Sequence, residues 1–126
     1  MPPELNDEDI KIIKEYLLNH LLLEVLERDL NIIKPVNLKM KDVYVKVLRY
    51  QRNNTIKQLS EIRKKMRKQG LSIYEEHRDQ VKILVKYLCR GYHYEFSMLW
   101  PLVKAELQIK LSKMFGIDFS DPTLTD

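Results

Sequence analysis

The chain has 126 residues, which suffice for one domain with a single hydrophobic core and are too few for two. Its 44% hydrophobic and 32% charged residues, with only three Gly and five Pro, are typical of a helix-rich domain and exclude an all-β protein. The net charge is +4, but residues 34–70 carry twelve basic and two acidic side chains, whereas residues 1–33 carry three basic and eight acidic ones.

The sequence also predicts a location in the cytoplasm. The one cysteine, Cys89, excludes an internal disulfide and suits a reducing compartment. The acidic first ten residues lack the basic and then apolar order of a signal peptide. The longest apolar block, residues 16–26, is too short and too often interrupted by polar residues to cross a bilayer, so we expect no membrane contact.

A first helix is expected from Asn6 to about Ile33. Asn6 is a favourable N-cap, and the three acidic residues that follow it face the positive end of the helix dipole. Pro35 disfavours helix at the residue before it and so limits the helix at its other end. Residues 16–26 are apolar on more than one face, which predicts a helix buried by two neighbours.

A second helix is expected from Leu38 to Gln69, with Gly70 as the left-handed residue that ends it. A third is expected over residues 72–115, beginning with a capping box of Ser72 and Glu75. Its apolar residues recur at steps of three or four, the spacing of one helix face. They are Val81, Val85, Leu88, Tyr92, Phe96, Leu99, Val103, Leu107, Leu111 and Met114. Pro101 then predicts a kink in this helix, and Gly116 its end.

These elements predict an all-α fold. It is an antiparallel bundle of three long helices, the third kinked near Pro101 so that the helices can also be counted as four. Residues 1–126 form a single domain, with residues 1–5 and 118–126 as flexible ends. At about 1.5 Å per residue the third helix would be roughly 65 Å long and would extend beyond the other two. Because monomers avoid exposed apolar stripes, this overhang predicts a homodimer.

The most unusual stretch is aromatic and carries six candidate interface or pocket residues: Arg90, Tyr92, His93, Tyr94, Phe96 and Trp100. Tyr, Trp and Arg are the residues that most often anchor interfaces, which favours a partner-binding surface. The alternative is a core layer of large residues at a helix crossing near Gly91, with the tyrosine hydroxyls hydrogen-bonded.

A basic run near the end of the second helix gives four candidate anion-binding residues: Arg63, Lys64, Arg67 and Lys68. One interpretation is binding to the phosphate backbone of a nucleic acid. The other is a solvated face, because cations are favourable at a helix C-terminus. No aromatic residues accompany this face for stacking on bases, and no helix-turn-helix spacing is visible.

Residues for metal binding or catalysis do not form a complete motif. His20 and Glu24 are one helical turn apart, but no Glu-x-x-His pair of the kind found in di-metal bundles occurs in the chain. Cys89 and His93 would also lie one turn apart on a helix, where a packed cysteine is more often inert than nucleophilic. There is no glycine-rich phosphate loop and no nucleophile elbow. We therefore expect no metal, no cofactor and no enzymatic activity.

The segment from Cys89 to Leu111, CRGYHYEFSMLWPLVKAELQIKL, resembles small uncharacterised helical proteins of Bacillus-type bacteria, the YhjD-like group. The resemblance extends to residues 24–29 and to the turn at Gly70 with the acidic segment after it. It implies an all-helical bacterial protein and carries over no functional residues.

The function expected from the sequence is that of a non-enzymatic structural or protein-interaction module that self-associates. One alternative is a nucleic-acid-associated protein that uses the basic second helix. Another is a helical bundle that binds a small ligand or a metal.

Overall fold

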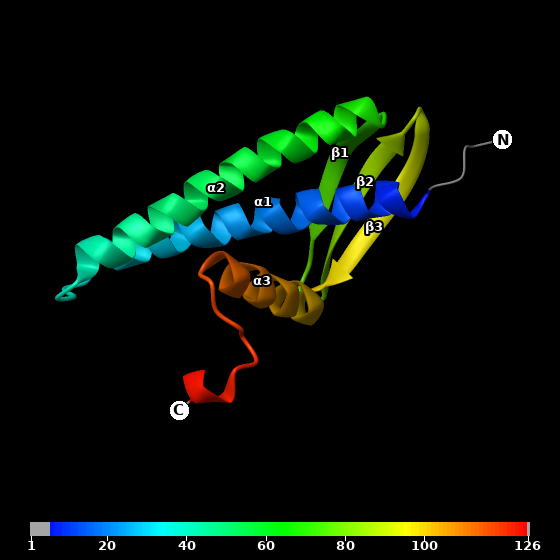
Figure 1. Cartoon of the computed structure of the whole chain (residues 1–126). Helices are drawn as coiled ribbons and strands as arrows, with labels where there is room; N and C mark the ends of the chain where they lie inside the picture. The colour runs from blue at the N-terminus through cyan, green and yellow to red at the C-terminus, as the bar shows by residue number, and fades with distance from the viewer. Residues whose placement is uncertain (1–5, 126) are drawn as a thin grey trace.

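The computed structural model describes residues 6–125, which form three α-helices, a three-stranded sheet and a short 3-10 turn (Figure 1). In chain order the elements are α1 (Asp7–Ile33), α2 (Lys41–Lys68), β1 (Leu71–Arg78), β2 (Lys82–Cys89), β3 (Tyr92–Leu99), α3 (Trp100–Met114) and η1 (Pro122–Leu124). The fold is therefore α+β, and the expectation of an all-α bundle is wrong.

α1 and α2 form a long antiparallel hairpin in which α1 begins and ends where the sequence predicts. Asn6 Oδ1 accepts a hydrogen bond from the backbone N–H of Asp9 at 2.8 Å, and Asp9 Oδ2 accepts one from Asn6 N at 3.5 Å, which completes a capping box. α1 buries leucines on more than one side because α2 runs along it and the sheet lies across its first half (Figure 1). Gly70, at φ +67°, ends α2 as predicted.

The three strands are antiparallel in the order β1-β2-β3, and one face of the sheet packs on the helices. In β2 the side chains of Ile83, Val85, Tyr87 and Cys89 are almost completely buried, and the residues between them are only partly buried. This alternation is the two-residue period of a strand with one face on a core. The turn between β2 and β3 consists of Arg90 and Gly91, both with positive φ, as in the two-residue turns that suit the twist of a hairpin.

The predicted helix over residues 72–115 is thus three strands joined by two tight connections and followed by the short helix α3. The apolar residues spaced three and four apart lie on both faces of the sheet. For example, Val85 is on the buried face and Leu88 on the open one. The same pattern omitted Ile83 and Tyr87, which are among the most buried side chains of the chain. Ser72 and Glu75 lie in β1 and cap no helix.

Pro101 lies in the first turn of α3 and kinks nothing. A proline is favourable there because the first backbone N–H groups of a helix have no partner within it. α3 crosses beneath α1 and ends against α2, where Gln51 Nε2 donates a hydrogen bond to the carbonyl oxygen of Met114 at 3.0 Å. Gly116 ends α3 as predicted, at φ +75°, and the N–H of Ile117 bonds to the carbonyl of Ser112 at 2.9 Å.

The overhang from which the homodimer was predicted does not exist, because the chain reverses direction at Gly91. Helix length is therefore no longer an argument for self-association, and any such argument must come from features of the molecular surface. Of the ends predicted to be flexible, residues 1–5 and 126 lie outside the described residues, and residues 118–125 include the short turn η1. Within residues 6–125, no helix has both the length and the apolar composition that spanning a membrane requires.

Candidate interaction surfaces

The six aromatic-stretch residues do not form one surface, because a strand sends alternate side chains to opposite faces. On β3, Tyr94 and Phe96 are half-buried and pack against the core, whereas Tyr92, the first residue of the strand, is exposed. His93 points to the open face, where its Nδ1 lies 2.9 Å from the Tyr74 hydroxyl oxygen. The structure therefore favours the core interpretation for Tyr94 and Phe96.

Trp100 is the first residue of α3 and is half-buried against the core. Its Nε1–H donates a hydrogen bond of 2.7 Å to the carbonyl oxygen of Asp79, in the turn between β1 and β2. The indole thus anchors the start of α3 to the end of the sheet, while one part of the ring remains available at the surface.

Arg90 has a structural role at the other end of the sheet. Its Nη2 donates a hydrogen bond of 2.8 Å to Oδ2 of the fully buried Asp9, and its Nη1 donates one of 3.0 Å to the carbonyl oxygen of Gln69. The hydrogen bond from Arg90 holds the pKa of Asp9 below its ordinary value, despite the burial that opposes this shift. Arg90 therefore joins the β2–β3 turn to the start of α1 and the end of α2.

Cys89 is fully buried, and its Sγ lies 3.8 Å from Asp9 Oδ2. Burial raises the pKa of its thiol, and the nearby Asp9 carboxylate raises it further. His93 is on the opposite face of the sheet, so the two side chains do not meet as they would on a helix. The expected thiol–imidazole spacing is therefore wrong.

His20 and Glu24 are engaged in an ion-pair network between α1 and β1. His20 Nε2 lies 3.5 Å from Glu24 and 3.7 Å from Glu76. Arg78 donates two hydrogen bonds of 2.8 Å to Glu24 and one of 2.8 Å to Glu76, and the pKa of Glu24 is lowered mainly by its bonds to Arg78. Among residues 6–125 no group of three or more His, Cys, Asp and Glu side chains is arranged to hold a metal ion.

An apolar groove of about 790 Å³ lies where α3 crosses α1. Trp100 belongs to its lining. Its walls are leucines and valines of the two helices: Leu21, Leu22, Val25, Val103, Leu107 and Leu111. The charged residues on its rim are Glu24, Arg78 and Lys104, of which the first two are paired with each other, and Gln80 and Gln108 also belong to its lining. Sequence reasoning missed this groove, because it depends on how α1 and α3 cross and no local spacing encodes that crossing.

The four basic candidates at the end of α2 do not converge on one site. Arg63 lies over the ring of Tyr16 at 5.7 Å, and Lys64 lies 3.7 Å from Glu61. Arg67 and Lys68 are exposed. Of the twelve Lys and Arg residues in the segment 34–70, only Lys64 forms an ion pair with a described residue. α2 therefore presents a basic outer face that acidic residues of α1 do not pair with in the described part of the chain.

Comparisons with known proteins confirm the resemblance to YhjD-like proteins that the segment from Cys89 to Leu111 indicated. The chain is similar to the protein named "Uncharacterized protein YhjD" of Bacillus subtilis (strain 168), with 27% identity over 105 residues that make up 83% of this chain and 88% of that protein. No solved structure matches the chain. The family model described as YhjD protein matches residues 4–119, which include every helix and strand up to the end of α3, and the chain therefore belongs to the YhjD family.

Proposed function

We propose that this chain is a non-enzymatic interaction protein that self-associates through the groove between α1 and α3. The groove itself carries the proposal. Its interior is lined by apolar side chains, and two of its three charged rim residues, Glu24 and Arg78, already bind each other through two hydrogen bonds of 2.8 Å. The lining also includes the amide side chains of Gln80 and Gln108, but apolar side chains predominate in it, so the groove suits apolar side chains of a protein.

A second copy is the favoured partner because the chain exposes further apolar side chains away from the groove. Ile109, Phe115 and Phe119 are all exposed around the end of α3, where a monomer would leave them in water. Association of two copies would shelter surfaces of both kinds at once, and closed symmetric dimers are the commonest soluble oligomers.

Sedimentation equilibrium over a wide concentration range tests the proposal. Val25, 38% exposed in the groove, and Val36, 42% exposed at the tip of the α1–α2 hairpin, form a matched pair of sites. The wild-type chain and Val36→Lys should dimerise equally. Val25→Lys should weaken dimerisation at least about tenfold, because it would bury an unpaired ammonium group. Circular dichroism should show unchanged helix and strand content in both variants.

A strictly monomeric wild-type chain would reject self-association. Equal dimerisation of Val25→Lys and Val36→Lys would reject the groove as the contact, since only one of these sites lies in it.

A second candidate function, nucleic-acid association, is favoured by the charge of α2. Lys46, Lys57, Lys64 and Lys68 recur at helical spacing along its outer face. From Lys46 to Lys68 the face extends for about 33 Å, close to one turn of a DNA duplex. The corresponding test is to measure salt-dependent binding to duplex DNA. The basic face that would bind the DNA is separate from the groove.

A further inference from the structure

We infer that the groove of one molecule receives the C-terminal arm, residues 117–125, of a second copy. This inference rests on the proposed self-association and names the segment that makes the contact. The occupant is therefore a defined peptide with apolar and acidic side chains, and the two copies would exchange arms reciprocally.

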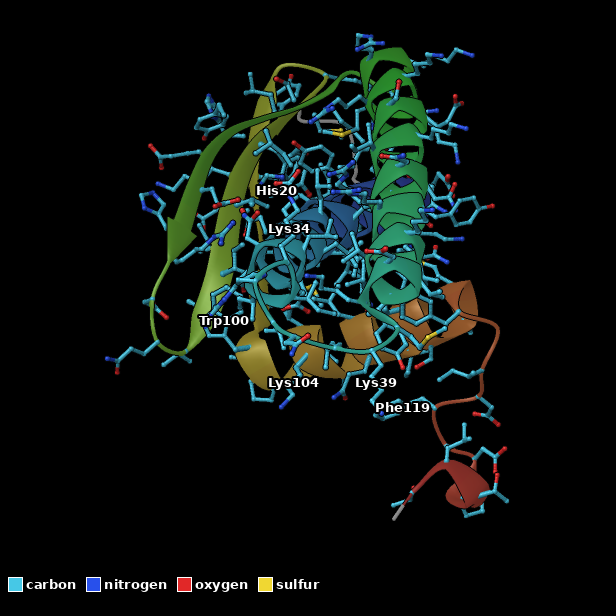
Figure 2. The ribbon with its side chains drawn as sticks, turned by 90° about the vertical axis from the view of Figure 1, so that its left-hand side faces the viewer. His20, Lys34, Lys39, Trp100, Lys104 and Phe119 are labelled. Carbon is cyan, nitrogen blue, oxygen red and sulfur yellow. The ribbon has the colours of Figure 1, made fainter. Side chains whose placement is uncertain are left out.

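The arm carries apolar side chains that its own molecule leaves exposed. Ile117, Phe119 and Leu124 are 45%, 55% and 59% exposed. In both views the arm leaves the end of α3, and its last turn, η1, stands clear of the helices and the sheet (Figures 1 and 2). An apolar segment held away from the body of the molecule in this way is suited to bind an apolar surface of another molecule.

The arm has a defined shape although it lacks a core of its own. Asp118 Oδ1 accepts hydrogen bonds from the backbone N–H and the hydroxyl of Ser120, at 3.0 and 2.7 Å. Asp121 Oδ1 accepts the equivalent pair from Thr123, at 2.9 and 2.7 Å. These two consecutive turns restrict the arm before it binds, and such preorganisation reduces the entropy lost on association.

The arm is directed away from the groove of its own chain. The hydrogen bond from Ile117 N–H to the Ser112 carbonyl turns the arm toward the side of α3 that carries Ile109 and Lys113. The groove is lined by the other side of the helix, with Val103, Leu107 and Leu111. At 100° per residue the two sets lie on roughly opposite sides of the helix, so the arm would have to undo its helix stop to enter its own groove.

Charge complementarity also matches the arm to the groove. The arm carries the carboxylates of Asp118 and Asp121, and it has no basic residue. Lys104 on the groove rim forms no ion pair with any residue in the range 6–125. Figure 2 shows Lys104 near the same end of α3 as Trp100, at the surface of the molecule. An arm laid along the groove would bring a carboxylate within reach of this ammonium group.

A cross-linking experiment on the full-length chain distinguishes exchange between copies from docking within one chain. Val25→Cys/Phe119→Cys carries one thiol in the groove and one on the arm, while the native Cys89 is fully buried. A short bismaleimide should give covalent dimers of this variant. The matched control Val36→Cys/Phe119→Cys moves the first thiol to the hairpin tip and should give at least about fivefold less dimer. Covalent monomers with an internal link would overturn the inference.

Sedimentation of a second matched pair separates failure of the arm from failure of the proposed function. Leu124, 59% exposed on the arm, and Met40, 58% exposed before α2, are each replaced by Asp. Leu124→Asp should weaken dimerisation at least about tenfold, and Met40→Asp should leave it unchanged. If Leu124→Asp dimerises like the wild-type chain while Val25→Lys does not, the groove stands and the arm is rejected. If the wild-type chain is monomeric, both proposals fail together.

Discussion

At the scale of single residues, the ion pair of the buried Asp9 with the exposed Arg90 explains how a small fold holds three elements together. Asp9 has three tasks: its side chain caps α1, accepts a hydrogen bond from Arg90, and lies against the Cys89 thiol. Asp9 Oδ1 is buried and has no partner among the described residues, so the carboxylate relies on Arg90 to remain ionised. A left-handed Arg90, at φ +49°, places the guanidinium where it reaches this carboxylate.

Replacing Asp9 by Asn should therefore lower the free energy of unfolding at neutral pH by about 1–2 kcal/mol, because a charge-assisted hydrogen bond to the partly exposed Arg90 is lost. The lowered pKa means that the ionised carboxylate stabilises the folded chain above pH about 4. This contribution disappears as the pH falls through the lowered pKa. Urea denaturation should accordingly show a difference between wild type and Asp9→Asn that shrinks in acid.

The control for that measurement is Asp7→Asn, which removes an exposed carboxylate from the same helical turn. It should change stability by about 0.5 kcal/mol or less at neutral pH. A wild-type to Asp9→Asn difference that stays constant from neutral pH into acid would contradict the assignment of the stabilisation to the ionised Asp9.

At the scale of elements, the sequence revealed the ends of helices better than the type of the element between them. Asn6, Gly70 and Gly116 act through local backbone and capping geometry, so the sequence around each of them is enough to predict a helix end. The sheet was missed because the apolar residues of two strands and a helix coincide with a single helical period. The alternation of Lys82 and Lys86 with buried residues was the overlooked signal of β2.

The prediction that the aromatic-stretch residues form one contact surface failed for a related reason. Once residues 92–99 form a strand, alternate side chains belong to different faces, so a set chosen by closeness in sequence is divided. The groove is the opposite case, since Val25 and Leu107 are distant in sequence and meet only through the crossing of α1 and α3. Family membership, in contrast, was accessible from the sequence because it depends on residue identity and not on a correct assignment of secondary structure.

The role of Pro101 can be tested directly. In the first turn of α3 it displaces no helical hydrogen bond, so Pro101→Ala should change the free energy of unfolding by less than about 1 kcal/mol. A proline inside a continuous helix would behave differently, because its replacement by Ala would stabilise the protein by roughly 3 kcal/mol. Thermal and urea denaturation of this variant would distinguish the two arrangements, and a large stabilisation would be incompatible with α3 beginning at Trp100.

At the scale of the whole molecule, charged and apolar surfaces are divided between different elements. The basic side chains lie along the outer face of α2, whereas the groove lies between α1 and α3. The α1–α2 hairpin extends past the sheet, and in Figure 2 Lys34 and Lys39 mark its tip on the side toward the viewer. Because the two surfaces share no residues, binding of an anionic polymer along α2 and dimerisation through the groove can be measured separately in the same chain.

The basic face of α2 predicts a specific dependence on salt. If it binds duplex DNA, the logarithm of the association constant should fall linearly with the logarithm of salt concentration, by about 0.9 for each phosphate contact. Lys46→Gln/Lys68→Gln should reduce that slope by about 2, because it removes two contacts from opposite ends of the face. Lys110→Gln/Lys113→Gln makes the same change in net charge on α3 and should leave the slope nearly unchanged. Fluorescence anisotropy with a labelled duplex measures all three proteins, and equal slopes for the two variants would show that net charge alone, and not the face of α2, attracts the DNA.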